Sequence, residues 1–404
     1  MATFKTTPLL DIVDDRLIPP SQDGASLRRR KAASHASPKP NLGDGHTVRP
    51  IDRKKYSRRR KSVHSLLRRS WFLPLALMLV TLSLYALNPT SSNIIHHFLF
   101  LSYKVSGDGD SPQYGKGPWD FAFVAFYTVF LSFTRELVMH EVLRPLARRL
   151  GIQSRGKQLR FTEQMYTATY IAFAGPFGLY CMRRTPVWYF NTRGMYEGFP
   201  HTTQDAGLKF YYLFQAAFWV QQAIVMVLGV EKRRKDFKEL VGHHVVTVTL
   251  IGLSYRFHFT YIGIAVYITH DISDFFLAVS KSLNYIDSPY QGHSFGLCIA
   301  TWTYLRHYIN LRILYSLTTE FGAVGPYELD WAAEQFKCPL SNVVTFVLLA
   351  SLQALNLFWL YCLLRSAYKF VYLGIAKDDR SEDEAPDDDL VEKEREDAVS
   401  AMKK

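Results

Sequence analysis

Four ionisable residues lie inside two consecutive apolar runs, where a membrane makes such residues costly and where they usually serve function. His243 and His244 open one run, and Asp271 and Asp274 lie in the middle of the next. Histidine is the usual acid–base side chain near neutral pH and can also act as a nucleophile. A carboxylate beside it fixes its tautomer and stabilises its charged form. Inside a bilayer, such a set suits acyl transfer between lipid substrates.

The spacing of the two runs predicts that these residues meet at one depth. The least apolar point between the runs is the segment 256–258. If the chain reverses at residue 257, His244 lies 13 residues before the turn and Asp271 lies 14 residues after it. At the rise of an α-helix both residues are then roughly 20 Å from the turn. An antiparallel helix pair would therefore bring them together.

The positions along each helix also predict which side chains share a face. Asp271 and Asp274 are three residues apart, and His270 and Asp274 are four apart, so each pair lies on one helix face. His243 and His244 are adjacent and point about 100° apart on a helix. We therefore expect one histidine to act in the reaction and the other to support it.

Three other interpretations of the four residues remain open. The histidines could be polar anchors at a membrane interface, or the set could be a structural His–Asp network between two helices. Two His and two Asp could also bind a divalent cation, but adjacent histidines of a regular helix cannot both reach one metal, and the His-x-x-His-His clusters of membrane di-iron enzymes are absent from the sequence. We therefore expect no resident metal or cofactor. The sequence contains neither a Gly-x-Ser-x-Gly turn nor a phosphate-binding P-loop.

A third apolar run adds a basic residue at a similar depth. Arg306 lies about eleven residues into the run 295–317. It is a candidate counter-ion for Asp271 or Asp274, or for an anionic group of a substrate, and a structural ion pair is equally open. The same run contains Trp302, and Arg306 and Asn310 lie four residues apart on one helix face.

The composition predicts an all-α, polytopic membrane protein with about eight transmembrane helices. Of the 404 residues, 48% are hydrophobic and 15% aromatic, and the polar residues concentrate at the two ends. Several of the apolar runs are shorter than the ~20 residues of a perpendicular span, so we expect them to extend into flanking polar residues. The eight runs are 71–87, 119–134, 165–181, 208–230, 243–257, 261–280, 295–317 and 341–365.

The charge distribution predicts that both termini are cytosolic. The net charge is +12, and the segment 53–61 holds seven basic residues in nine. A basic cluster next to a span orients it with that side in the cytosol; binding to anionic lipid headgroups is a second possibility, and nucleic acid is not an expected partner. The basic loop 183–209 opposes this topology, so the count of spans between residues 90 and 210 stays open.

The two tails, the segment 94–103 and the cysteines give further expectations. We expect a disordered basic tail over 1–70 and an acidic tail over 371–404, in which Ser381 fits an acidophilic kinase site. The segment 94–103 is too short to span and predicts an interfacial helix, whose His96-His97 pair we interpret as a surface feature. A disulfide between Cys181 and Cys338 is an open alternative.

The stretch from His243 to Leu283 strongly resembles the diagnostic motif of the ceramide synthases, the longevity-assurance group of the TLC-domain proteins. The resemblance includes the His pair, the runs 257–260 and 268–269, the pattern Asp271-x-Ser-Asp-Phe-Phe and the run 281–285. The TLC domain would cover residues 158–370, preceded by further transmembrane helices and loops over 71–157. His270 departs from the family pattern, in which we expected a less polar residue.

The resemblance implies N-acylation of a sphingoid base, dihydrosphingosine or phytosphingosine, with fatty acyl-CoA as co-substrate in the endoplasmic reticulum. His243, His244, Asp271 and Asp274 would be the catalytic set, in a helix bundle enclosing an apolar tunnel. Partners would be a small single-spanning accessory subunit, a second copy or paralogue in a dimer, and membrane lipid. Two alternatives are a non-enzymatic TLC-domain protein that senses or chaperones lipids and a di-iron lipid hydroxylase. Substrate-binding candidates are Arg306, Trp302 and His270.

Overall fold

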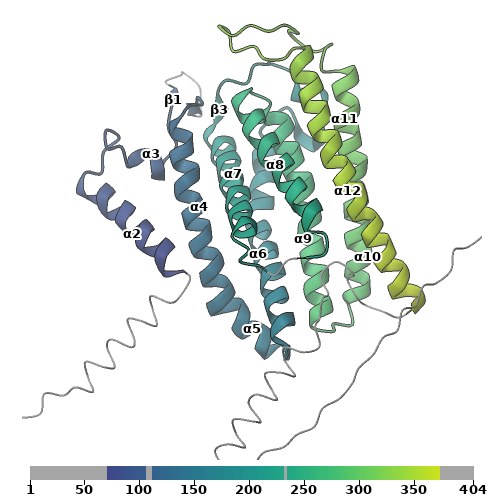
Figure 1. Cartoon of the computed structure of the whole chain (residues 1–404). Coiled ribbons are helices and arrows are strands. Elements are labelled where there is room, and N and C mark those ends of the chain that lie inside the picture. Colours follow the sequence, from purple (N-terminus) through teal and green to yellow (C-terminus); the bar gives the residue numbers. More distant parts are fainter. Residues whose placement is uncertain (1–70, 106–111, 232–233, 374–404) are drawn as a thin grey trace, which may run out of the picture. The chain divides into compact units, whose positions relative to one another are not determined.

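The computed structural model describes residues 71–105, 112–231 and 234–373. The expectations for the two tails, including Ser381, concern residues outside these ranges. Within them the chain is mostly helical with only three short strands, and helices α4 to α12 run alongside one another, with α2 packed on the α4 side (Figure 1). This confirms the prediction of an all-α polytopic membrane protein.

The main helices follow the apolar runs of the sequence. Each of the eight runs lies in helical structure to within three residues at its ends, and the run 295–317 is divided over α10, a π-helical turn and α11. The predicted extension into polar flanks occurs, for example where α4 continues through a π-helical turn into α5. The bounds are α2 (Phe72–Leu87), α4 (Trp119–Leu137), the π-turn Val138–Leu143, α5 (Arg144–Arg149), α6 (Arg155–Arg183), α7 (Ala206–Val227), α8 (Phe237–Arg256), α9 (Thr260–Tyr285), α10 (Gln291–Trp302), the π-turn Thr303–Ile309, α11 (Asn310–Thr319) and α12 (Pro339–Leu373).

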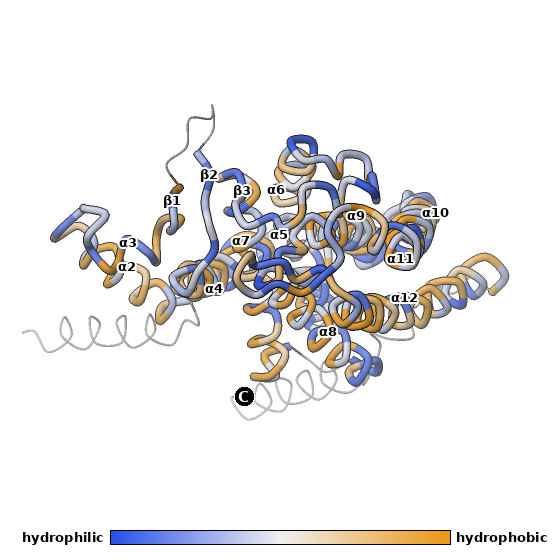
Figure 2. Tube along the Cα trace, turned by 90° about the horizontal axis from the view of Figure 1, so that it is seen from above, coloured by the Kyte–Doolittle hydropathy of each residue, from blue (hydrophilic) through white to orange (hydrophobic). Residues whose placement is uncertain are grey.

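Four helices of the described ranges are long and apolar enough to cross a membrane by themselves: Trp119–Arg149, Ala206–Val227, Thr260–Tyr285 and Pro339–Leu373. Their outward faces carry large apolar side chains such as Val343, Val347 and Leu357 on α12, which are exposed. Figure 2 shows apolar residues predominating along α12. An apolar outer surface of this kind fits a lipid environment, because lipid tails do not expel apolar side chains as water does.

Short strands tie the loops together at one end of the bundle. β1 (Lys104–Val105) pairs with β2 (Gln113–Tyr114), and β2 pairs with β3 (Gln204–Asp205), both antiparallel. The fully buried Lys209 secures this end, because its Nζ lies 2.8 Å from Asp120 Oδ1 and donates to the carbonyls of Ser102 and Gly115 at 2.9 and 2.7 Å.

One expectation from the sequence needs correction here, and one open alternative is decided. The interfacial helix over 94–103 is reduced to α3 (His96–Leu99), because Phe100 is extended and the chain turns at Tyr103, with φ +64°, into the sheet. Nearby, His97 stacks on Trp119 at 4.5 Å. The open alternative of a disulfide is not realised, since Cys181 and Cys338 are not linked in the structure.

The predicted reversal at residue 257 is confirmed. α8 ends at Arg256 and α9 begins at Thr260, so only three residues connect them. His258 takes a left-handed conformation, with φ +66°, which stops one helix and starts the next within a tight turn. The two helices that carry the His pair and the aspartates are thus consecutive partners.

The turn is held by a cluster of ionisable groups outside the helices. Lys116 Nζ lies 3.0 Å from His258 Nδ1 and donates to the carbonyl of His201 at 3.0 Å, while His258 Nε2 lies 3.2 Å from Glu334 Oε2. Burial lowers the pKa of Lys116 to about 7, although Glu334 opposes this shift. Burial and the nearby Lys116 lower the pKa of His258 to about 3, so the imidazole is neutral at physiological pH and accepts from the lysine.

Lys116 gives the fold a testable dependence on pH. Its pKa is about 7 when folded and 10.5 ordinarily, so between these values the unfolded chain binds more protons and stability rises with pH. From about pH 7 to about pH 9, the unfolding midpoint of the wild type should therefore gain on that of Lys116→Met, measured by thermal unfolding in detergent. Parallel pH profiles of the two proteins would contradict this assignment.

Candidate functional site

The two histidines lie side by side in the second turn of α8, and both are buried. Aromatic rings enclose His243: Trp219 of α7 and Trp359 of α12 meet it edge to face, with ring centroids 5.6 and 5.2 Å away. Trp219 also contacts His244 at 5.8 Å. These rings fix the position of His243 from two further helices.

The two imidazoles have different hydrogen bonds, as their 100° separation predicts. His244 Nδ1 lies 2.9 Å from the carbonyl of Leu240, to which only an N–H can donate, so its Nε2 is left as an acceptor. His243 Nε2 lies 3.5 Å from the hydroxyl of Thr247, and its Nδ1 has no protein partner among the described residues. Of the two rings, His243 is the less committed to the protein.

Asp271 is held by polar side chains of α7. The side-chain amide of Gln215 donates to Asp271 Oδ2, and the hydroxyl of Tyr211 donates to the same oxygen at 3.4 Å. Gln215 is itself oriented by Tyr170 of α6, whose hydroxyl donates to its Oε1 at 3.1 Å. All of these groups are buried, so this network fixes the carboxylate of Asp271.

Gln215 and Gln221 of α7 offer a matched test of this network. Gln215→Leu removes the amide donor to a buried carboxylate and should lower the free energy of unfolding by about 1–3 kcal/mol. Gln221 is equally buried, but neither its Nε2 nor its Oε1 has a protein partner in the described ranges. Gln221→Leu should therefore leave the unfolding midpoint unchanged or raise it. Equal midpoints for the two variants would contradict the network.

Arg306 forms the ion pair that the sequence left open, and its partner is Asp274 at 2.6 Å. Its other donors go to Ser273 Oγ at 2.6 Å, Asn356 Oδ1 at 3.1 Å and the carbonyl of His270 at 3.2 Å. The π-helical turn Thr303–Ile309 carries Arg306, and such turns are frequent at functional sites. The guanidinium therefore links three segments of the bundle.

The other two substrate-binding candidates take different places. Trp302 is buried, and its ring faces the Arg306 guanidinium. The Cζ atom of Arg306 lies 4.0 Å from the centroid of the Trp302 ring. His270 lies behind Arg306, where its Nε2 is 3.2 Å from Asn356 Nδ2 and its Nδ1 is 2.8 Å from the carbonyl of Val266. Both therefore help to position Arg306.

A polar cavity of about 230 Å³ brings the predicted residues together. In the described ranges no hydrogen bond joins the two histidines to the two aspartates, whose partners are Gln215, Tyr211 and Arg306. They are brought together because they line the same cavity. Its wall includes His243, His244, Asp271, Asp274, Trp302 and Arg306. Charged side chains of α4, α6 and the segment before α8 also line it. His270 does not line it.

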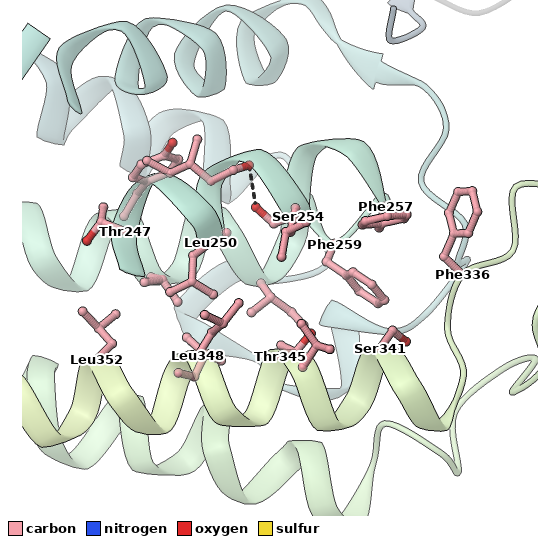
Figure 3. Close-up of a pocket in the computed structure, with 18 of the residues that line it drawn as sticks. Thr247, Leu250, Ser254, Phe257, Phe259, Phe336, Ser341, Thr345, Leu348 and Leu352 are labelled. Carbon is pink, nitrogen blue, oxygen red and sulfur yellow. Dashed lines mark hydrogen bonds between the residues drawn. The ribbon is translucent and has the colours of Figure 1, made fainter. Parts of the chain in front are cut away.

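A second cavity, of about 320 Å³, is apolar and runs between α8, α9 and α12. Figure 3 shows its wall, from Thr247 and Leu352 at one end to Phe257 and Phe336 at the other. His270 lines this cavity rather than the polar one. Among the described residues, His243 and Trp219 are the two that line both cavities, so His243 lies where an apolar chain and a polar group can meet.

Several of these residues give little signal in the sequence. Gln215, Tyr211 and Asn356 lie on helices α7 and α12, without a motif of their own. Trp219 and Trp359 resemble ordinary core aromatics. The available signal is an amide side chain within an apolar run, since a buried polar side chain needs a partner. Each run holds three such amides, so the sequence does not say which of them reach the site: Gln215, Gln221 and Gln222 in 208–230, and Asn342, Gln353 and Asn356 in 341–365.

The helical bundle and the buried His and Asp residues around one cavity define a polytopic membrane protein with a candidate catalytic site. Comparison with known proteins gives its family. A family model described as the TLC domain matches residues 160–365. A sphingosine N-acyltransferase-like protein of Gibberella moniliformis is 56% identical over 338 residues, which cover 81% of this chain and 87% of that protein.

Two yeast proteins agree with this comparison. The ceramide synthase LAG1 of Saccharomyces cerevisiae is 47% identical over 320 residues, 79% of this chain and 77% of that protein. The sphingosine N-acyltransferase lac1 of Schizosaccharomyces pombe is 41% identical over 371 residues, 89% of this chain and 96% of that protein. The chain belongs to the fungal ceramide synthases of the TLC-domain family and is an acyltransferase.

Proposed function

We propose that this acyltransferase joins a fatty acyl group from acyl-CoA to the amine of dihydrosphingosine or phytosphingosine, giving dihydroceramide or phytoceramide. The observation that carries the proposal is the position of His243 at the junction of the two cavities. The apolar cavity suits an acyl chain, and the polar cavity suits the amine and the thiol carrier. The carbonyl carbon of the thioester would lie between them, beside His243.

The chemistry needs one proton acceptor and one proton donor. The amine nitrogen attacks the thioester carbonyl, the C–N bond forms, the C–S bond breaks and the thiolate leaves. In this route His243 removes the proton of the attacking amine and passes it to the thiolate. In the alternative route His243 first attacks the thioester as a nucleophile and the thiolate leaves; the amine then attacks the acyl-imidazole, the imidazole leaves, and the amine proton goes to the thiolate. Its free Nδ1 and its weak contact with Thr247 leave the ring available for either role.

The other candidate residues support this centre. His244, with its tautomer set by Leu240, and Asp271, held by Gln215, would stabilise the charge that develops during transfer. Asp274 would keep the Arg306 guanidinium at the wall of the polar cavity, and Trp302 would hold that guanidinium from its face. His270 would act indirectly, by packing behind Arg306.

The remaining parts of the proposal concern the cell. We place the enzyme in the endoplasmic reticulum membrane with both termini cytosolic, acting without a resident cofactor and with acyl-CoA as co-substrate. A small single-spanning accessory subunit and dimerisation with a second copy or a paralogue belong to the same proposal. In the described ranges no group of three or more His, Cys, Asp or Glu is arranged to hold a metal ion.

The decisive experiment is amide formation by the purified protein from sphinganine and a panel of acyl-CoAs, alone and with its accessory subunit. Product from wild type, and none from a folded Asp271→Ala variant, would support both the reaction and the site. An inactive wild type under both conditions would favour lipid sensing or chaperoning instead. Full activity in Asp271→Ala would make the His–Asp set structural.

A further inference from the structure

The polar cavity contains more cationic side chains than the reaction at His243 needs. Its wall holds Arg135, Arg234, Lys281 and Arg306. Arg135 is 3% exposed and pairs with Glu136 and Glu231, and Arg306 is 2% exposed with its donors on protein groups. Arg234 and Lys281 are the more accessible pair of the four and have no role in the proposed chemistry.

Arg234 is held in a fixed orientation with one edge open. Its Nε and Nη2 donate to the two carboxylate oxygens of Asp236, each at 2.9 Å, and its side chain is 24% exposed. This bidentate pair leaves Nη1 for another acceptor. Asp236 is buried and also accepts from Trp359 Nε1 at 3.1 Å. The guanidinium is therefore anchored to the same tryptophan that contacts His243.

Arg234 and Lys281 lie at the same end of the bundle. Arg234 precedes the start of α8, and Lys281 lies in the last turns of α9, which runs antiparallel to α8 after the turn at 257. Nine residues separate Arg234 from His243, and ten separate Lys281 from Asp271. Within α9 the Cα atoms of Lys281 and Asp271 are therefore about 15 Å apart along the helix axis. Arg234 lies three residues before the start of α8 and His243 six residues after it, so their Cα atoms have a comparable separation.

This separation matches the arm of an acyl-CoA. The chain of atoms from the thioester sulfur to the first phosphorus is as long as the backbone of about four amino-acid residues, so its extended length is about 15 Å. Phosphate oxygens prefer arginine and lysine, and an anchored guanidinium binds them with little loss of freedom. A thioester at His243 would thus place the phosphates beside the two basic groups.

Building on the proposed function, we infer that Arg234 and Lys281 form the binding site for the phosphate groups of the thiol carrier. Asp236 orients Arg234 within that site. The acyl chain then occupies the apolar cavity, the pantetheine arm the polar cavity and the phosphates its basic end. The carrier, and not only the acyl chain, is recognised by the enzyme.

A pair of substrates tests the site directly. One is an acyl-CoA, and the other is the N-acetylcysteamine thioester of the same acyl group, which has no phosphate. For Arg234→Ala and for Lys281→Met we expect KM for acyl-CoA to rise about tenfold, the loss of one charge-assisted contact. KM and kcat for the phosphate-free thioester should stay at wild-type values. Lys238→Ala, an exposed residue of the same basic segment outside the cavity, is the matched control.

The outcomes separate the two proposals. Equal losses for both thioesters, or an unchanged KM for acyl-CoA, would overturn the phosphate site while leaving the acyltransferase reaction intact. Wild type that forms no amide from either thioester would contradict the proposed function itself. Because the phosphate-free thioester reports on the catalytic centre, damage to Trp359 or His243 in Arg234→Ala would appear as a lower kcat with that substrate.

Discussion

His243→Ala should lower the rate of amide formation by roughly 10²- to 10⁴-fold, the usual contribution of a positioned acid–base or nucleophilic side chain. The reason is geometric, because His243 is the one ionisable residue of the described part of the chain that lines both cavities. The measurement is single-turnover formation of ceramide from sphinganine and acyl-CoA. The variant should fold, since among the described residues the imidazole makes one weak hydrogen-bond contact, with Thr247, and otherwise only ring contacts, with Trp219 and Trp359 among them.

The controls for this prediction distinguish the two roles of the histidine. His293→Ala, an exposed residue outside both cavities, should retain full activity. If His243 is a nucleophile, wild type given acyl-CoA without an amine will release about one thiol per active site in a burst, and His243→Ala will not. If it is a base, no such burst will occur. Substantial ceramide formation by His243→Ala would place the catalytic centre elsewhere.

Arg306→Met should cost about 3–5 kcal/mol of stability and abolish activity, because it leaves the carboxylate of Asp274 without its counter-ion. Ser273 and Asn356 lose a donor at the same time. The measurement is the thermal unfolding midpoint in detergent together with the rate of ceramide formation. Asp274 is partly exposed to the polar cavity, which places the expected cost at the lower end of this range.

A second substitution separates the two effects of Arg306→Met. Adding Asp274→Asn removes the unpaired charge and should restore much of the lost stability, whereas activity should stay low. Such non-additivity is the signature of residues that act as a pair. An Arg306→Met variant as stable as wild type, or a double variant no more stable than the single one, would show that the pair contributes nothing to the fold.

The sequence predicted the helices and the hairpin of the site because both follow from simple periodicities. Apolar runs located the eight helical segments, and one polar point near residue 257 located the turn between α8 and α9. From these, the common depth of His244 and Asp271 followed by counting residues. The expected counter-ion role of Arg306 also followed, since a buried charge needs a partner, although the choice of Asp274 over Asp271 did not.

The remainder depended on contacts between segments far apart in the chain. Gln215 is 56 residues from Asp271, and Asn356 is 50 residues from Arg306, so no local spacing could pair them. The two cavities depend on how α12 packs against α8 and α9, which no pattern in one helix specifies. The helix predicted over 94–103 is shorter than expected, His96–Leu99, because the apolar residues of this segment concealed the extended Phe100 and the turn at Tyr103.

The shared wall formed by His243 and Trp219 between the two cavities has a consequence for how the enzyme treats water. An acyl group activated between the two cavities has the walls of the apolar cavity on one side. A competing water molecule must therefore reach it through the polar cavity, as the amine does. Once the amine fills that cavity, water is excluded. The ratio of aminolysis to hydrolysis is then set by how fully the polar cavity is occupied. A saturating sphingoid base therefore protects the activated acyl group from hydrolysis.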